Sequence, residues 1–186
     1  MRNAFYILAL AAVALFAQQQ PIIKEQGDEV PGSLAPYLPT PMTIVDQMLD
    51  AGHLKAGETM FDLGSGDGRI VIEAARKYKA TAIGIELDDA LAAISTQKIA
   101  DLGLEKTARI VRGDLLLQNY SSADLITVYL WPEANRKVTA ILENQLKKGA
   151  RVVSHDFEMP PWKPTETITI PDDGTGRSHM LYVYIR

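Results

Sequence analysis

The feature that most constrains this chain is residues 62–69, Asp-Leu-Gly-Ser-Gly-Asp-Gly-Arg, in which three glycines alternate with other residues. Before them, Thr59-Met60-Phe61 is typical of the end of a buried strand. Behind them, apolar residues recur at helical spacing from Ile70 to Tyr78. Glycine lets the backbone approach a ligand closely, and the first turn of a helix offers free N–H groups. The pattern therefore predicts a nucleotide-binding turn that joins a strand to a helix.

The spacing of the glycines distinguishes between the known kinds of nucleotide-binding turn. The dinucleotide fingerprint is G-x-G-x-x-G, whereas Gly64, Gly66 and Gly68 give G-x-G-x-G, with Arg69 in the third fingerprint position. The phosphate-loop pattern G-x-x-x-x-G-K-[ST] does not occur in the sequence. Asp62, at the carboxyl end of the strand, would repel a diphosphate and attract a cation.

The arrangement D-x-G-x-G-x-G resembles the first motif of the Rossmann-like (class I) S-adenosylmethionine-dependent methyltransferases. This resemblance implies that S-adenosyl-L-methionine is the cofactor and that Gly64, Ser65, Gly66 and Gly68 bind it. It also implies that Asp62 engages the ammonium group of the methionine moiety. The alternative is a glycine-rich turn of purely structural use, although alternating glycines weaken a chain unless something approaches closely.

Two later strand patterns end in acidic residues that suit the rest of such a cofactor. Glu86 ends a strand-like run just over twenty residues beyond the glycines, where a ribose diol requires a carboxylate acceptor. Asp114 follows the next run, and in methyltransferases an Asp after the third strand commonly accepts from the adenine amino group. The neighbouring Leu87 and Leu115 are assigned to the same cofactor site. A solvated Glu and an ordinary turn Asp are the alternatives.

The remaining patterns predict an α/β fold with a doubly wound, mostly parallel sheet. They are a helix over 91–102, strands over 108–112 and 124–130, a helix over 135–146 and a strand over 150–157. The last two strands, 166–170 and 180–185, are separated only by a short turn and must form an antiparallel hairpin. Five βα steps closed by a hairpin match the Rossmann-like methyltransferase fold of seven strands.

The N-terminal region precedes this pattern and divides into two segments. Residues 1–17 combine an early Arg2 with an apolar run and a small residue before a polar break, which is typical of a secretory signal peptide cleaved after Ala17. An uncleaved membrane anchor is the alternative, although the run is short for a membrane span. Residues 18–36 are predicted to be a linker and residues 37–186 the methyltransferase domain. The protein is thus expected to be exported, periplasmic or membrane-anchored.

A short amphipathic helix is predicted over residues 43–49, ended by Gly52. Thr40 followed by Pro41 has the form of an N-cap with proline at the first helical position. The helix before the first strand often folds over the cofactor in this fold, so Tyr37 and Thr40 are assigned to the cofactor site.

Charge and composition limit the classes of ligand. The net charge is −4, and Lys and Arg are scattered or helix-borne, so no basic stripe for duplex nucleic acid is evident. The chain has no cysteine, and no His, Asp and Glu cluster has convincing metal-ligand spacing, so no metal is predicted. We expect a monomer.

The methyl acceptor is expected beside the carboxyl end of the fourth strand, at Tyr129-Leu130-Trp131-Pro132. The Asn/Asp-Pro-Pro-Tyr motif of many amine- and amide-directed methyltransferases is absent there, which disfavours methylation of base amino groups of that type. A slot of Tyr129 and Trp131 would suit an alkyl amine, because ring faces stabilise a cationic nitrogen. The alternative is that both rings only cap the core.

His155 and Asp156 follow the fifth strand and are the remaining catalytic candidates. A histidine there could act as a base, because its proton exchanges near neutral pH. A hydrogen-bonded structural histidine is the alternative. The other two histidines, His53 and His179, are expected to lie away from the site.

Four segments together are similar to a narrower group, the mitochondrial lysine methyltransferases that modify the ATP synthase c-ring protein and the adenine nucleotide translocase, with their bacterial relatives. The segments are Tyr37 to Pro41, Asp62 to Val71, Gly84 to Leu87 and Gly149 to Ser154. The resemblance, over roughly residues 36–164, implies a protein lysine as acceptor, on a membrane-associated protein. An exported protein that binds an adenosine-containing ligand without turnover and a small-molecule methyltransferase are the alternatives.

Overall fold

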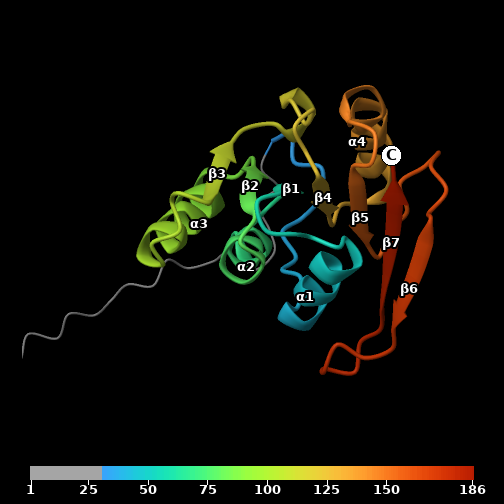
Figure 1. The fold of residues 1–186 in the computed structure, drawn as a ribbon, viewed down its shortest axis with the longest axis horizontal. Helices are drawn as coiled ribbons and strands as arrows, with labels where there is room; N and C mark the ends of the chain where they lie inside the picture. The colour runs from blue at the N-terminus through green and yellow to red at the C-terminus, as the bar shows by residue number, and fades with distance from the viewer. Residues whose placement is uncertain (1–30) are drawn as a thin grey trace, which may run out of the picture.

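A computed structural model of the protein describes residues 31–186, and the expected signal peptide at 1–17 lies outside the described residues. The described chain forms a seven-stranded sheet in the order β3-β2-β1-β4-β5-β7-β6 (Figure 1). The strands are β1 (Thr59–Leu63), β2 (Thr81–Glu86), β3 (Ala108–Arg112), β4 (Leu125–Val128), β5 (Arg151–His155), β6 (Glu166–Ile170) and β7 (His179–Ile185). The helices are α1 (Met42–Ala51), α2 (Arg69–Tyr78), α3 (Asp89–Asp101), α4 (Pro132–Gln145) and the 3-10 turn η1 (Leu115–Leu117).

The predicted fold class and the predicted hairpin are confirmed. Strands β1 to β5 pair in parallel, whereas β7 lies antiparallel between β5 and β6. From the edge strand β3 the chain crosses to β4, on the other side of β1, so the strand order reverses between β1 and β4. Doubly wound sheets bind ligands at the carboxyl ends of the strands at such a reversal. The fold places the glycine turn, which follows β1, at this point.

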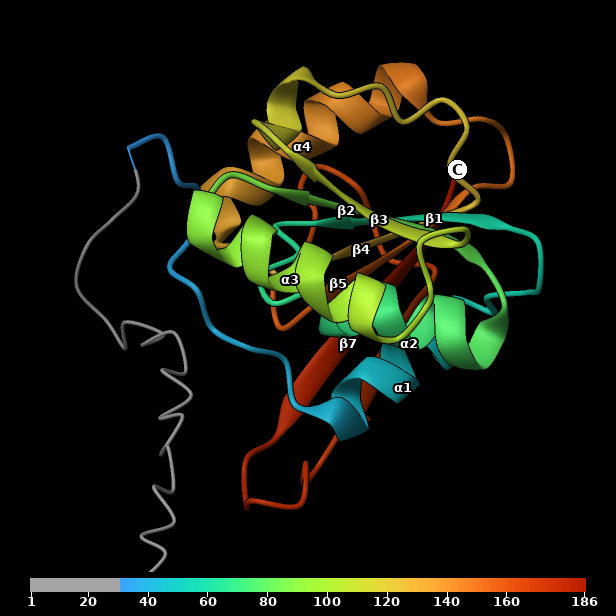
Figure 2. The ribbon, with the colours of Figure 1, turned by 90° about the vertical axis from the view of Figure 1, so that its left-hand side faces the viewer.

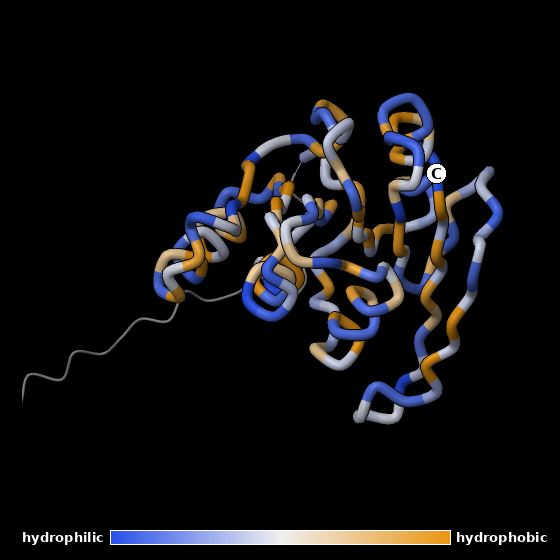
Figure 3. Tube along the Cα trace, viewed as in Figure 1, coloured by the Kyte–Doolittle hydropathy of each residue, from blue (hydrophilic) through white to orange (hydrophobic). Residues whose placement is uncertain are grey.

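Alternate residues of the strands build two cores, one on each face of the sheet. Met60 of β1 lies in the core that α1 and α2 cover, whereas Phe61 lies in the core that α4 and η1 cover. Figure 2 shows α1, α2 and α3 on one face and α4 on the other. Along the edge strand β6, hydrophobic residues alternate with hydrophilic ones (Figure 3), because one side is covered. Each fully buried aliphatic side chain contributes roughly 1.5–3 kcal/mol.

The expectation of five βα steps is wrong, because only α2, α3 and α4 follow strands among the described residues. Strand β3 leads into η1, and the segment between β5 and β6 has no helix. The segment after β3 is too polar for an amphipathic helix, so it covers the sheet with single side chains. Leu115 and Tyr120 are buried there, and the Tyr120 hydroxyl donates to the Leu115 carbonyl at 2.6 Å.

The expected N-cap of the first helix is also wrong by one residue. Pro41 occupies the cap position of α1, and its carbonyl accepts from the backbone N–H groups of Ile44 and Val45. Thr40 is buried instead, and its carbonyl accepts from the Arg69 guanidinium at 2.9 Å. Thr40 therefore connects the start of α1 to the glycine turn rather than capping the helix.

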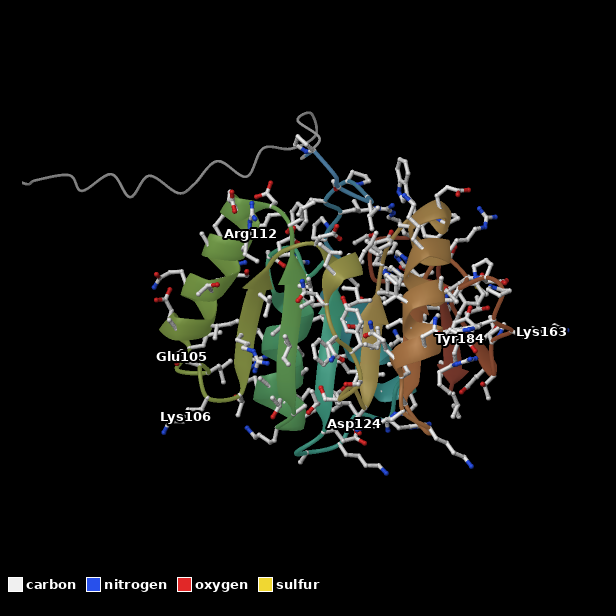
Figure 4. All side chains as sticks on the ribbon, turned by 90° about the horizontal axis from the view of Figure 1, so that it is seen from above. Glu105, Lys106, Arg112, Asp124, Lys163 and Tyr184 are labelled. Carbon is white, nitrogen blue, oxygen red and sulfur yellow. The ribbon has the colours of Figure 1, made fainter. Side chains whose placement is uncertain are left out.

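The sheet has two distinct edges where its strands begin and end. In Figure 4, Arg112 lies at the edge where the parallel strands end, and Glu105, Lys106 and Asp124 lie at the opposite edge. Residues 31–41 pass over the first of these, the carboxyl edge, where Gly32 approaches Leu87. The described residues contain no helix with the length and hydropathy that a membrane span requires.

Candidate methyltransferase site

The glycine turn after β1 has a backbone that side chains rarely adopt. Gly64, Gly66 and Gly68 have φ angles of +77°, +53° and +78°, in the region that glycine favours. The N–H groups of Gly64 and Ser65 both donate to the Ile85 carbonyl at 3.0 Å, which fixes the turn against the end of β2. The three glycines are therefore required by backbone conformation alone.

The three glycines have different neighbours, so they play different parts in the turn. A Cβ on Gly66 would lie 2.6 Å from the Tyr37 ring, so Tyr37 covers the turn at that point. Gly64 is exposed beside Leu130 at the end of β4. A Cβ on Gly68 would lie 2.8 Å from the Cβ of Ser95 in α3, so Gly68 permits the close packing of α2 and α3.

The Ser65 side chain packs against the neighbouring strand β2, and a contact between Ser65 and the cofactor stays a prediction. Its hydroxyl lies over β2, in the space that a Cβ of Gly84 would take at 2.5 Å, and has no hydrogen-bond partner among the described residues. Asp67, between the glycines, is structural: its carboxylate accepts from Arg69 and from Lys98 of α3 at 2.9–3.0 Å. These two ion pairs lower the pKa of Asp67, against the effect of its burial.

Glu86 lies at the carboxyl end of β2, in the place expected for a ribose acceptor. It is 8 % exposed, and its two carboxylate oxygens accept from the N–H groups of Gly66 and Asp88 at 2.7 and 2.9 Å. A carboxylate accepts about four hydrogen bonds, so each oxygen retains a lone pair for a hydroxyl. Glu86 thus joins the glycine turn to the start of α3 and can accept from a diol at the same time.

Asp62 is a buried carboxylate on the face of β1 that α1 and α2 cover. It is 3 % exposed and accepts from the Thr127 hydroxyl of β4 at 2.8 Å. Burial raises the pKa of Asp62 to about 7, although the hydrogen bond from Thr127 favours the charged form. A nearby cation, such as an ammonium group, would stabilise the charged form of Asp62. The sequence does not predict the role of Thr127, whose only signal is a polar residue within an apolar strand.

Asp114 and its neighbours complete the carboxyl edge beyond Glu86. The Asp114 carboxylate accepts from the Leu116 N–H at 2.8 Å and so caps η1, while Gly113 donates to the Glu86 carbonyl. Leu115 is buried in the core beneath. The contact between Asp114 and adenine stays a prediction. The Leu115 side chain packs in the hydrophobic core.

The donor set fits the S-adenosylmethionine that the sequence predicts. Asp62 offers a buried acceptor for an ammonium group, Glu86 an acceptor for a ribose diol, and Gly64 an exposed backbone without Cβ. Tyr37 lies over this turn, and burial raises the pKa of its hydroxyl, which therefore stays protonated at neutral pH. Arg69 fixes the same segment through Thr40.

The aromatic residues after β4 do not form the expected slot. Tyr129 packs on the His155 ring, with ring centroids 3.9 Å apart, and its hydroxyl donates to Asp156 at 3.3 Å. Burial and the Asp156 charge raise the pKa of Tyr129 to about 12. Trp131 is 57 % exposed at the rim and joins none of the ring contacts found among the described residues. The two rings therefore present separate surfaces.

The expectation that His179 lies away from the site is wrong. Strand β7 returns antiparallel to β5, which brings His179 Nδ1 to 2.9 Å from His155 Nε2 and 3.1 Å from the Asp156 carboxylate. Asp173 accepts from His179 Nε2 at 3.3 Å. Burial lowers the pKa of His155, whose ring is fully buried. The only signal in the sequence is the place of His179 at the start of the last strand.

Comparisons with known proteins agree with this site. Residues 62–166 match the family model described as the ANTKMT methyltransferase domain. A protein-lysine N-methyltransferase of Saccharolobus islandicus is 36 % identical over 81 % of this chain and 92 % of its own length. The adenine nucleotide translocase lysine N-methyltransferase of Mus musculus is 31 % identical over 76 % of this chain, which spans only 60 % of that protein.

A solved structure extends the comparison to three dimensions. The RNA methyltransferase from Salinibacter ruber, crystallised with S-adenosyl-L-homocysteine, is 38 % identical over 80 % of this chain and 93 % of its own, with a TM-score of 0.74. S-adenosyl-L-homocysteine is the product that S-adenosylmethionine leaves after methyl transfer. Glycine turn, buried acidic residues, fold and relatives agree: the chain belongs to the ANTKMT methyltransferase domain family and is an S-adenosylmethionine-dependent methyltransferase.

Proposed function

We propose that the protein methylates the ε-amino group of lysine in a protein, and that this protein is associated with a membrane. Two relatives carry names that specify lysine as the acceptor, one from Saccharolobus islandicus and one from Mus musculus. The Salinibacter ruber structure is described as an RNA methyltransferase at a similar level of identity. The charge of the carboxyl edge in this chain favours a protein lysine over RNA.

The carboxyl edge is acidic, and this observation carries the proposal. Its carboxylates, which lie at or just beyond the carboxyl ends of β1 to β5, are Asp62, Glu86, Asp88, Asp89, Asp114, Glu133, Asp156 and Glu158. Three of the arginines nearby are paired with acidic residues, Arg69 with Asp67, Arg112 with Asp89 and Arg136 with Glu133, and Arg177 is a further positive charge near Tyr129. Such an edge attracts a lysine ammonium and repels a phosphodiester backbone.

The residues of the chain supply position and charge rather than covalent chemistry. S-adenosylmethionine, when bound, supplies an electrophilic methyl group. The glycine turn, Asp62 and Glu86 hold the donor at the end of β1, beside the end of β4 where Tyr129 and Trp131 lie. Holding two reactants in line contributes most of the acceleration in a displacement of this kind. Trp131, exposed at the rim, offers a ring face to the alkyl stem of lysine.

The test is to identify the methylated group. The full-length protein is incubated with S-adenosylmethionine labelled in its methyl group, together with membrane and soluble fractions of cells that lack the gene. We expect the label in protein from the membrane fraction and, after acid hydrolysis, in N-methyllysine. Glu86→Ala should strongly reduce labelling at low S-adenosylmethionine concentration. Glu105→Gln, an exposed substitution at the opposite edge of the sheet, should leave it unchanged.

The same experiment tests whether RNA is the methyl acceptor. Ribonuclease treatment before precipitation should leave the label intact, and purified total RNA should accept none. Label that ribonuclease releases, with no methylated lysine in the hydrolysate, would overturn the proposal in favour of an RNA acceptor. Label in small molecules alone would favour the small-molecule methyltransferase.

We further propose that residues 1–17 direct the protein to the membrane, where a cleaved signal or an uncleaved anchor would bring it to its acceptor. The apolar sequence of this segment supports the proposal. N-terminal sequencing of the protein from fractionated cells separates cleavage after Ala17 from anchoring, and recovery of uncleaved protein from the cytosol would contradict both. Light scattering of the purified protein tests the expected monomer.

A further inference from the structure

We propose that His155, His179 and Asp156 bind a divalent transition-metal ion of the zinc class at the junction of β5 and β7. Methyl transfer from a sulfonium needs no metal, so this site is additional to the reaction described above. The sequence does not predict it, because the two histidines are far apart along the chain and only the antiparallel pairing of β7 with β5 brings them together.

The three ligand atoms form a compact triangle. His155 Nε2 lies 2.9 Å from His179 Nδ1, which lies 3.1 Å from the Asp156 Oδ2, and the third side is 3.4 Å. Ligand atoms on a tetrahedral ion with bonds of about 2.0–2.1 Å lie roughly 3.3 Å apart. An ion above the triangle therefore reaches all three atoms with small adjustments. The two imidazoles are 0 % and 5 % exposed, so this is a built site and not a surface cluster.

With both histidines neutral, the protons available to the triangle do not satisfy its three contacts. The bond from His179 Nε2 to Asp173 requires a proton on Nε2, which leaves a lone pair on Nδ1 of a neutral ring. Asp156 contributes only lone pairs. If His155 Nε2 carries a proton, it donates one hydrogen bond. The lone pair of His179 Nδ1 then faces a lone pair of the Asp156 carboxylate with no proton between them. A central cation accepts all three lone pairs at once.

The surroundings of the triangle resemble the outer shell of a metal site. Asp173 holds Nε2 of His179, the arrangement in which a carboxylate fixes the tautomer of a metal-binding histidine. The other oxygen of Asp156 accepts from the Met180 N–H at 2.9 Å. Tyr129 adds a hydrogen bond to Asp156 and packs on the His155 ring. Hydrogen bonds thus position His179 and Asp156, whereas ring packing alone holds His155, whose Nδ1 has no hydrogen-bond partner among the described residues.

The donor set indicates which ions fit. Two imidazole nitrogens and one carboxylate oxygen suit zinc and its neighbours Co²⁺, Ni²⁺ and Fe²⁺ better than Mg²⁺ or Ca²⁺, which prefer oxygen. Three protein ligands leave a fourth position for water. Through His179 and Asp173 the ion would connect β5 to β7 and to the β6–β7 turn, and Thr43 of α1 donates to the Asp173 carbonyl.

The test uses the full-length protein and the metal alone, with no methyl transfer involved. After treatment with a chelator, the protein is titrated with Co²⁺ and then with Zn²⁺. We expect one Co²⁺ per chain, with the visible absorption of a four-coordinate site, displaced by Zn²⁺, and a higher thermal midpoint with either ion. His179→Gln and Asp156→Asn should abolish the absorption, and Asp173→Asn should weaken binding by about 10- to 100-fold.

The third histidine of the chain gives a matched control. His53 is exposed with a positive φ, which Asn tolerates, so His53→Asn should bind Co²⁺ like the unmodified protein. Nitrogen NMR of the unmodified protein tests the site even if a variant fails to fold, because Zn²⁺ should shift His155 Nε2 and His179 Nδ1 and leave His53 in place. No Co²⁺ absorption, equal binding by His179→Gln, or a fully protonated His179 ring that Zn²⁺ leaves unchanged would overturn the proposal.

Discussion

The donor half and the acceptor half of the carboxyl edge are built in different ways. The donor half, the glycine turn with Glu86, comes from a short stretch of sequence, and its hydrogen bonds cross between the neighbouring parallel strands β1 and β2. The acceptor half combines Tyr129 after β4, His155 in β5 and His179 in β7, which returns antiparallel. A local motif thus determines the donor half, whereas long-range topology determines the acceptor half.

The start of α1 is the element that contacts both halves. The Thr40 carbonyl accepts from Arg69 beside the glycine turn, and the Thr43 hydroxyl donates to the Asp173 carbonyl beside His179. These two contacts lie within one helical turn of each other in the sequence. The difference between the two halves can be tested. Variants of the donor half should change cofactor binding, and variants of the acceptor half should change methyl transfer to the acceptor.

The largest expected effect is on the stability of Asp62→Asn. The pKa of Asp62 is near 7 in the folded protein, against an ordinary value of 3.8, so between about pH 4 and 7 the folded state holds a proton that the unfolded state has lost. Stability of the unliganded protein therefore falls as pH rises through this window, by an amount on the order of 4 kcal/mol in total. Asp62→Asn removes this cost, and we expect urea unfolding to show a more stable variant at pH 8.

The same substitution should impair the donor half. The Asp62→Asn variant has no charge for the cofactor ammonium, so its affinity for S-adenosylmethionine should fall by at least about tenfold at pH 8. In the unmodified protein the affinity should rise with pH through about 7, as Asp62 ionises. Calorimetric titration at pH 6 and pH 8 measures both effects. A variant that is less stable at both pH values and binds the cofactor normally would show that Asp62 is only a structural group.

The next largest effect is expected for Glu86→Ala. The substitution removes a buried acceptor of the Gly66 and Asp88 N–H groups together with the ribose acceptor, at a cost of about 2–3 kcal/mol in binding. Affinity for S-adenosylhomocysteine should fall by roughly 30- to 150-fold. Glu133→Gln, on the acceptor side and highly exposed, is the matched control and should bind normally. Equal affinities for both variants would contradict the division into halves.

This division explains which parts of the molecule could be predicted from sequence. Glycine spacing and the acidic residue that ends β2 act over one or two strands, so the pattern alone predicts their place at the carboxyl edge. The strand alternation and the short turn before β7 predict the sheet, including the antiparallel hairpin, because no helix fits into that turn. These predictions depend on local geometry that few tertiary contacts can override.

The failures have other causes. Nothing near His179 in the sequence suggests a site, although the register of β7 brings it to His155. The missing helix after β3 has a local cause, since Leu115 and Tyr120, within one short segment, suffice to cover that face. The failure at His179 therefore concerns a contact between distant segments.

A smaller effect is expected for Trp131→Ala, which tests the rim of the acceptor half. Because Trp131 is 57 % exposed, its removal should leave stability within about 0.5 kcal/mol and cofactor affinity unchanged. If its ring faces the lysine stem, KM for the protein acceptor should rise by about three- to tenfold. Steady-state kinetics at saturating S-adenosylmethionine measures this. Trp131→Phe, which keeps a ring, should recover most of the loss.

The smallest effect, expected for Tyr129→Phe, decides what the acceptor half contributes. The pKa of Tyr129 is raised to about 12, first by burial and then by the charge of Asp156, so its hydroxyl stays protonated at neutral pH and cannot take the proton of a lysine ammonium. Phe keeps the packing on His155 and loses only a 3.3 Å hydrogen bond, worth about 1 kcal/mol. We expect kcat to fall no more than about fivefold, with cofactor affinity unchanged. A loss of roughly 100-fold or more in kcat would make the hydroxyl a catalytic group, and the acceptor half would then act through chemistry rather than through position and charge.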